Sequence, residues 1–202
     1  RSSDLACPGG LGLAAVARES GTVIAYGRRL AWTSADEDDS KRRTTRKDRR
    51  ITAILHTGMP IRYWDHELGE ESPRLLRLDP AGARTDNSAA HDLTPLAGHA
   101  LHETSAVIST DGRALITTWR TARAGGRVEY TLVRIDVVSG AHTVLADEPG
   151  AGLHGPKLSP NGALVAVLRH TDGSYDHAFD DRLQLRELDE RGGRTARELE
   201  LG

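Results

Sequence analysis

The chain has 202 residues and a formal charge of −2, from 27 Lys and Arg against 29 Asp and Glu. This balance excludes a global basic field for binding nucleic acid or an anionic membrane. The single cysteine, Cys7, excludes an internal disulfide and a cysteine metal cage. Aromatic residues make up only 4% of the chain, whereas Gly residues number 21, and this composition favours many short strands and turns.

The first residues carry no clear targeting signal. Leu5-Ala6-Cys7 is similar to the end of a bacterial lipoprotein signal, but Asp4 stands where that signal needs an apolar residue, and no apolar region precedes it. The longest apolar stretches are well under the ~18 residues of a membrane helix. We therefore expect a cytoplasmic protein without membrane contact. Because the chain begins with Arg1 rather than Met, we also expect a piece of a longer chain.

Two hairpin-like segments recur 50 positions apart. Residues 109–117 read Ser-Thr-Asp-Gly-Arg-Ala-Leu-Ile-Thr, and residues 159–167 read Ser-Pro-Asn-Gly-Ala-Leu-Val-Ala-Val. Each predicts a tight two-residue turn followed by a buried strand, because Gly accepts a positive φ and an Asp or Asn side chain binds nearby backbone N–H groups. A weaker copy begins at Gly27. We assign a structural rather than a catalytic role to the turn residues Asp111, Gly112, Asn161 and Gly162.

A second pattern follows each hairpin. It reads Leu-x-x-Leu/Ile-Asp and ends at Asp79, Asp136 and Asp189, with spacings of 57 and 53 residues. A Gly and another short strand come next, which we predict at 93–96, 142–145 and 196–201. Four strands in a unit of ~50 residues are typical of a β-propeller blade. A β-sandwich with similar hairpins is the alternative.

The predicted fold is all-β, a partial β-propeller of about three to four four-stranded antiparallel blades. We place the whole chain, 1–202, in one propeller domain, with units at about 14–97, 103–147 and 153–201 and a long insertion at 34–72. Closed propellers have ~4 to 8 blades. Further blades are therefore expected outside this segment, and no catalytic domain is expected within it.

The insertion opens with two charge blocks. Residues 36–39 are all acidic, and residues 41–50 are mostly basic. Opposite blocks side by side on a nearly neutral protein favour a solvated, mobile loop over a nucleic-acid patch. We therefore predict no nucleic-acid partner.

The insertion also holds the densest group of side chains able to recognise a ligand. The group combines a guanidinium, two aromatic rings and acids, which could contact a substrate or a neighbouring domain on a propeller face. Packing of the aromatic rings against their own blade is the alternative. Two acids just beyond could hold a peptide amino group, or form an exposed acidic turn. The candidate contact residues are Arg62, Tyr63, Trp64, Asp65, His66, Glu70 and Glu71.

Motifs for catalysis, metals and cofactors are not found. No Ser lies in a Gly-x-Ser-x-Gly elbow, and no Gly-rich phosphate loop is recognisable. His99 and His102 are three residues apart but lack a third ligand. The acidic stretch Asp172–Asp176 does not follow the order of ligands in an EF-hand. We predict no catalytic residue, no metal site and no cofactor.

The hairpins at 109–113 and 159–163 resemble the Ser-Pro-Asp-Gly turn of TolB-like propeller repeats, although Thr110 replaces Pro and Asn161 replaces Asp. Residues 48–76, with Arg-Tyr-Trp-Asp-His at 62–66 and Ser-Pro-Arg-Leu at 72–75, resemble the N-terminal propeller of acylaminoacyl-peptidase and dipeptidyl-peptidase-like members of the prolyl oligopeptidase family. The second resemblance implies a C-terminal α/β-hydrolase domain of the same chain, carrying a Ser-Asp-His triad, and short peptides as substrates. The propeller would gate access to that domain.

Two functions therefore remain open. One is the gating and substrate-selecting portion of a serine peptidase, which is a hydrolase used in proteolysis. The other is a TolB-like propeller that binds a protein or ligand with no enzyme attached.

Overall fold

The structure is a computed structural model. It describes residues 9–30, 33, 36–56, 62–63, 66–78, 90–189 and 192–200, and for residues 36, 63, 66–67, 189 and 192–200 it describes the backbone alone. Within these ranges the chain is mostly β, in antiparallel sheets that do not close into a barrel. No helix in the described part of the chain is both long enough and apolar enough to span a bilayer.

Three four-stranded antiparallel sheets follow one another along the chain. The first sheet contains β1 (Leu11–Val16), β2 (Val23–Leu30), β5 (Glu71–Leu78) and β6 (Ala90–Asp92). The second contains β7 (Ala106–Ile108), β8 (Ala114–Ala122), β9 (Val128–Asp136) and β10 (His142–Ala146). The third contains β11 (Gly152–Leu158), β12 (Leu164–Thr171), β13 (Asp180–Asp189) and β14 (Gly192–Glu200). Two shorter elements complete the order, the 3-10 turn η1 (Ala124–Gly126) and a small sheet of β3 (Arg62–Tyr63) and β4 (His66–Glu67).

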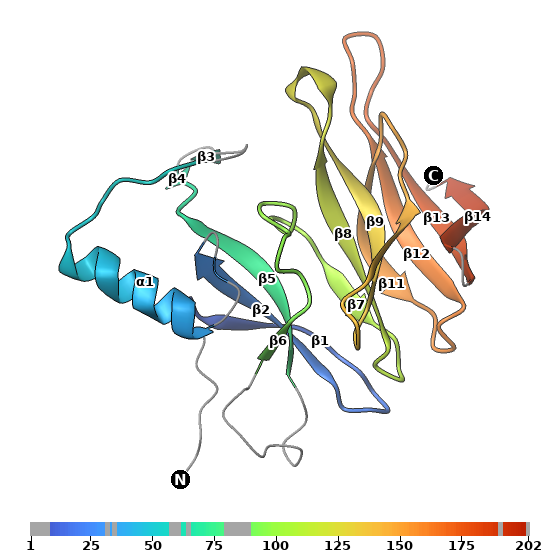
Figure 1. The fold of residues 1–202 in the computed structure, drawn as a ribbon. Coiled ribbons are helices and arrows are strands. Elements are labelled where there is room, and N and C mark those ends of the chain that lie inside the picture. The colour runs from blue at the N-terminus through green and yellow to red at the C-terminus, as the bar shows by residue number, and fades with distance from the viewer. Residues whose placement is uncertain are drawn as a thin grey trace.

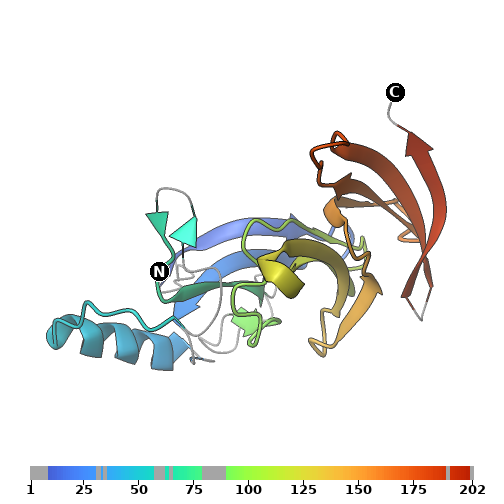
Figure 2. The same ribbon diagram turned by 90° about the horizontal axis from the view of Figure 1, so that it is seen from above.

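The sheets stand side by side, as Figure 1 shows, and from above α1 (Asp36–Asp48) and the third sheet lie at opposite ends of the molecule (Figure 2). The first strands of successive sheets, β1, β7 and β11, contact one another in turn, and the last strands β10 and β14 also touch. This arrangement differs from the two face-to-face sheets of the sandwich alternative.

Each gap between sheets is filled by aliphatic side chains. In β8, the consecutive residues Leu115 and Ile116 are both fully buried although their side chains point to opposite faces of the strand. Both faces of the second sheet are therefore covered by a neighbouring sheet. Leu115 packs with the first sheet in one core, and Ile116 packs with the third sheet in another. The core between the first two sheets includes Ile24, Leu75, Leu93, Val133 and Ile135, and the other includes Leu132, Leu153, Val165 and Val167.

The two matching turns at 109–113 and 159–163 have the same hydrogen bonds. Asp111 Oδ1 accepts from Ser109 Oγ at 2.5 Å and from the Arg113 N–H at 3.0 Å. Asn161 Oδ1 accepts from Ser159 Oγ at 2.7 Å and from the Ala163 N–H at 3.1 Å. Gly112 and Gly162 have positive φ, of 77° and 69°. The turns are nevertheless longer than the predicted two residues, since the Ser109 N–H bonds to the Ala114 carbonyl.

Two predictions for the first sheet were wrong. Gly27 lies inside β2, paired with Leu11 and Arg74, and the turn before this strand contains Gly21 with φ 69°. The weak copy was therefore placed six residues too late. The fourth strand is Ala90–Asp92 rather than 93–96, and Leu96 is 95% exposed.

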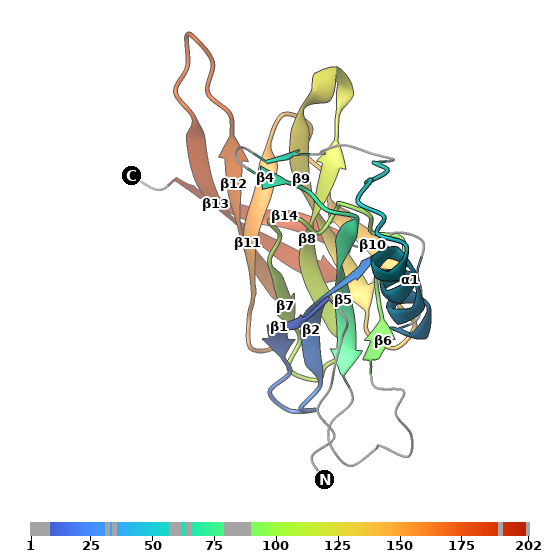
Figure 3. The ribbon, with the colours of Figure 1, turned by 90° about the vertical axis from the view of Figure 1, so that its left-hand side faces the viewer.

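The charged start of the insertion is a helix, α1, and not the expected loop. Its acidic block lies in the first turn and Arg46 and Lys47 lie in the last, which suits the helix dipole at both ends. The Asp39–Arg43 ion pair, four residues apart, adds local support. α1 contacts β2, and Figure 3 shows the helix beside the first sheet.

Candidate functional site

The aromatic segment of the insertion forms the small β3–β4 sheet. Arg62 pairs with Glu67 and Tyr63 pairs with His66 through the backbone, and the Arg62 side chain is exposed. The side chains of Tyr63 and His66, and the whole of Trp64 and Asp65, lie outside the described part of the chain. The structure therefore places only the backbone of this predicted contact segment.

The other two predicted contact residues, Glu70 and Glu71, pair with α1. Arg46 Nη1 lies 2.6 Å from Glu70 Oε1, and Arg43 donates to Glu71. Arg43 Nε also donates to Asp39 Oδ2 at 2.5 Å. These two glutamates therefore hold α1 against the first sheet.

A pocket of about 300 Å³ lies where α1 meets the first sheet. Its two arginines and two glutamates are the ion-paired residues just described, so its charges are balanced from within. It is lined by Leu30, Arg43, Arg46, Ile54, Gly69, Glu70 and Glu71.

A different group of side chains crosses the second and third sheets at the end where the β8–β9 and β12–β13 hairpins project, which we call the hairpin end (Figure 1). Four rings follow one another there, Tyr130, His154, His170 and Phe179, and we call them the ring row. Successive ring centroids are 4.7, 6.3 and 6.1 Å apart. Three of the rings stand on the strands β9, β11 and β12, and Phe179, just before β13, is 67% exposed.

Carboxylates surround the ring row. His170 Nδ1 lies 2.6 Å from Asp181 Oδ1, and His170 Nε2 lies 3.5 Å from Asp172 Oδ1. Tyr130 donates its hydroxyl to Glu103 at 3.4 Å. Burial, together with the nearby His170, lowers the pKa of His154, so this imidazole is neutral near pH 7. The row therefore combines aromatic faces with negative charge at its edges.

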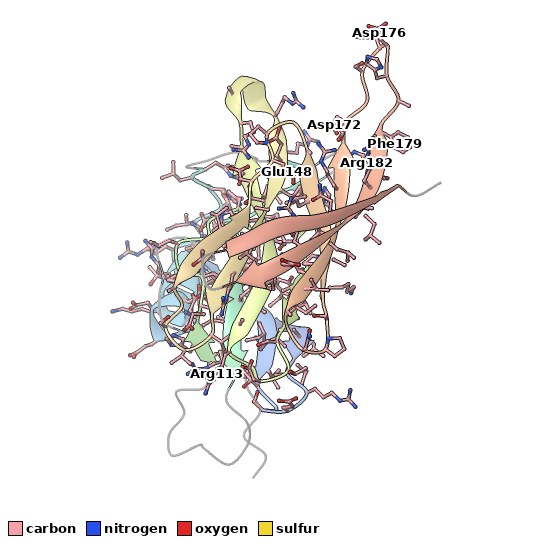
Figure 4. The ribbon with its side chains drawn as sticks, turned by 90° about the vertical axis from the view of Figure 1, so that its right-hand side faces the viewer. Arg113, Glu148, Asp172, Asp176, Phe179 and Arg182 are labelled. Carbon is pink, nitrogen blue, oxygen red and sulfur yellow. The ribbon has the colours of Figure 1, made fainter. Side chains whose placement is uncertain are left out.

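The connection between the second and third sheets, residues 147–151, is held by ion pairs below the ring row. Glu148 accepts from Arg169 Nε at 2.8 Å and also from the buried Arg186. Asp147 pairs with Arg123, which also donates to Glu129 at 2.7 Å. Figure 4 shows Glu148, Asp172, Phe179 and Arg182 toward the hairpin end, with Arg113 at the opposite end. These ion pairs keep the strands that carry the rings in fixed positions.

The two histidines weighed as metal ligands do meet. His99 Nδ1 and His102 Nε2 are 3.1 Å apart. Burial and the neighbouring positive charges of His99 and Arg120 lower the pKa of His102 to about 4. The positive charge of Arg120 also disfavours a bound cation. Among the described residues, no three His, Cys, Asp or Glu side chains are arranged to hold a metal ion.

The acidic hairpin at 172–176 binds its own chain instead. Ser174 Oγ accepts from the backbone N–H groups of Asp176 and His177, at 3.3 and 3.2 Å. Asp172 lies 3.9 Å from Arg127 of the β8–β9 connection, so the two projecting hairpins face each other.

Sequence reasoning did not find the ring row. Its members are separated by 24, 16 and 9 residues, and only strand register brings them together. One signal was present, because Phe179 is the single Phe of the chain and stands directly before the acidic pair Asp180 and Asp181.

Comparisons with known proteins identify a fold. No family model and no curated protein matches the sequence. Among solved structures, the chain is similar to a protein from Agrobacterium tumefaciens with a provisional assignment as TolB, at 15% identity and a TM-score of 0.50. The match covers 95% of this chain and 50% of the other, so the chain spans about half the length of that protein. At this identity the likeness concerns the fold alone: the chain has a TolB-like, propeller-type fold, and membership of the prolyl oligopeptidase family is not shown.

Proposed function

We propose that the three sheets are blades of a β-propeller and that this part of the ring is a binding platform for a polypeptide, with no chemistry of its own. The TolB-like fold supports the first half of this proposal. The ring row supports the second half, because propellers commonly bind partners at the end where loops and hairpins gather.

The observation that carries the proposal is the ring row, in which three rings stand on strands and Phe179 lies just before β13. Rings held on strands offer contact area at little entropic cost, and aromatic residues are enriched among the residues that dominate binding energy. Phe179 is largely exposed and Asp172 is 70% exposed, so both can be reached by a ligand.

The surrounding charges favour a ligand of one class. Asp172 and Asp181 lie beside His170, and aromatic faces attract cations. A peptide segment with a Lys, Arg or aromatic side chain fits this combination, whereas an acidic segment would be repelled.

Blocked tripeptides test this function. N-acetylated, C-amidated Ala-X-Ala, with X as Lys, Trp, Leu or Glu, would be titrated into the protein while backbone NMR shifts are followed. The Lys and Trp peptides should perturb the ring row. Phe179→Ala should weaken this binding about 10-fold. Val138→Ala is the matched control, since Val138 is also apolar and 71% exposed but lies in the β9–β10 turn. Equal effects of the two variants, or no perturbation by any peptide, would contradict the platform.

The peptidase interpretation has a separate test. It rests on the resemblance of residues 48–76, and the hydrolase domain and peptide substrates that it implies remain predictions, as does the cytoplasmic location. Labelling the full-length protein with a fluorophosphonate probe would support a serine hydrolase in the same chain. Absence of labelling would contradict the peptidase interpretation and favour a binding platform with no attached serine hydrolase.

A further inference from the structure

A second pocket lies at the opposite end of the sheets from the ring row, which we call the turn end. Its volume is about 280 Å³, and it opens between the second and third sheets beside the turns at 109–113 and 159–163. Residues of both sheets line it: Ser109, Ala114, Ile116, Arg134, Leu158, Gly162 and Leu188.

Small residues create this space. The core between these sheets is filled by Ile116 and its neighbours, with Leu158 and Leu188 at its edge. At the turn end the lining changes to Ala114 and Gly162, and a Cβ atom placed on Gly162 would have no heavy atom within 4 Å. The core therefore ends in an open, mainly apolar pocket.

One cation faces into this apolar lining. Arg134 is directly opposite Ile116 in the β8–β9 pairing, so both side chains leave the sheet on the face toward the third sheet. Arg134 is half-buried. Hydrogen bonds from Ser139 are the larger cause that lowers the pKa of Asp136, and the positive charge of Arg134 helps to lower it. Among the described residues no carboxylate forms a direct hydrogen bond or ion pair with the Arg134 side chain. Arg123, Arg169 and Arg186, by contrast, each bind a carboxylate.

Two acids of the nearby turns, Asp136 and Asp111, form hydrogen bonds within their own turns through one carboxylate oxygen each. Asp136 Oδ1 accepts from the N–H groups of Val138 and Ser139 and from Ser139 Oγ, at 3.1, 2.7 and 2.7 Å. Asp111 accepts from Ser109 Oγ and the Arg113 N–H within its own turn. These bonds leave the guanidinium donors of Arg134 available to a ligand.

We propose that the turn-end pocket binds an aliphatic carboxylate, with the carboxylate on Arg134 and the apolar chain against Ile116, Leu158 and Leu188. A guanidinium matches a carboxylate through two parallel hydrogen bonds. The volume is at the small end of the range for ligand pockets, about 300–1,000 Å³, which suits one short aliphatic group. This chemistry is shared by a free short-chain acid and by the C-terminus of a peptide that ends in an aliphatic residue.

Three probes separate the sources: 4-methylpentanoate, N-acetyl-Ala-Leu with a free carboxylate, and the same dipeptide as an amide. Each would be titrated by NMR. Binding of both acids indicates that a free acid is sufficient, and binding of the dipeptide acid alone indicates a peptide C-terminus. Either result supports the pocket. Equal binding of the amide, or no binding of either acid, would overturn it.

Variants then locate the site. Arg134→Met should weaken acid binding about 10-fold or more, because it removes the charge-assisted hydrogen bonds between the guanidinium and the carboxylate. Arg113→Met is the matched control, because Arg113 is an exposed arginine at the same end. If Arg134→Met does not fold, Ala114→Val gives the same test, since it fills the pocket and leaves the guanidinium in place. Unchanged binding in the variant that folds would refute the assignment. The ring-row test uses amidated peptides, so the two proposals can fail independently.

Discussion

A methyl group added to Gly112 would lie 2.2 Å from Ser20 Oγ. Gly112 belongs to the first turn of the second sheet, and Ser20 belongs to the corresponding turn of the first sheet. The Glu19 N–H also donates to the Thr110 carbonyl at 2.9 Å, so the two turns are joined through their backbones. The first and second sheets are therefore held together at the turn end by direct contact between equivalent turns, in addition to the apolar core.

This contact predicts a difference between two glycines with the same backbone conformation. Gly162→Ala introduces only the strain of a left-handed residue, about 1–2 kcal/mol, because its Cβ position is open. Gly112→Ala should cost about 1 kcal/mol or more beyond that, since Ser20 and Thr22 must move. Urea unfolding of both variants measures the difference. Adding Ser20→Gly to Gly112→Ala should recover part of the loss, and equal costs for the two glycines would exclude the contact.

The ion pairs between the second and third sheets give a second comparison. Glu148→Gln leaves Arg186, which is 4% exposed, without its carboxylate, and the free energy of unfolding should fall by about 1–3 kcal/mol. Asp147→Asn removes an acid that is 41% exposed and should cost less than about 1 kcal/mol. Thermal or chemical unfolding of the two variants is sufficient. The bridging role of Glu148 would be disproved by a loss no larger than that of Asp147→Asn.

The attachment of α1 depends on a fully buried acid. Asp39 accepts from the Leu30 N–H at 2.6 Å and from Thr33 Oγ1 at 3.1 Å, besides its pair with Arg43. Asp39→Ala should release the helix at a cost of about 1–3 kcal/mol. Trypsin should then cleave α1 faster, whereas Asp38→Ala, at an exposed position of the same turn, should leave the rate unchanged. Identical cleavage of the two variants would show that the helix is held by other contacts.

His102 predicts how stability depends on pH. Its pKa is about 4 in the folded chain against an ordinary 6.5, chiefly because of burial. Between these values the unfolded chain binds more protons than the folded one, so the free energy of unfolding falls as pH falls from 6.5 to about 4. Urea unfolding along this range would measure the slope. His102→Asn should reduce this slope, whereas His177→Asn, at an exposed position, should leave it unchanged. If His102→Asn does not change the slope, the pH dependence arises from other groups.

The sequence predicted the strand content and the two matching turns because these depend on contacts within a few residues. Asp111 and Asn161 bind N–H groups two residues away, and each following Gly accepts the positive φ. The same local rules failed for α1. Its helix has no apolar face to recognise, and Asp39 is buried through partners on β2 rather than by hydrophobic packing.

Residue types alone determined that the chain forms short antiparallel strands joined by Gly-containing turns, since backbone conformation and alternating burial act locally. Only the tertiary structure decided which polar residues meet. Tyr130 and His154 come from different strands and Phe179 from the chain just before β13, and Glu70 and Glu71, which were predicted as contact residues, form ion pairs with α1. The packing of the second sheet against the third likewise placed Arg134 in a mainly apolar pocket, where no carboxylate among the described residues forms a direct ion pair with it, while Asp136 and Asp111 form hydrogen bonds within their own turns.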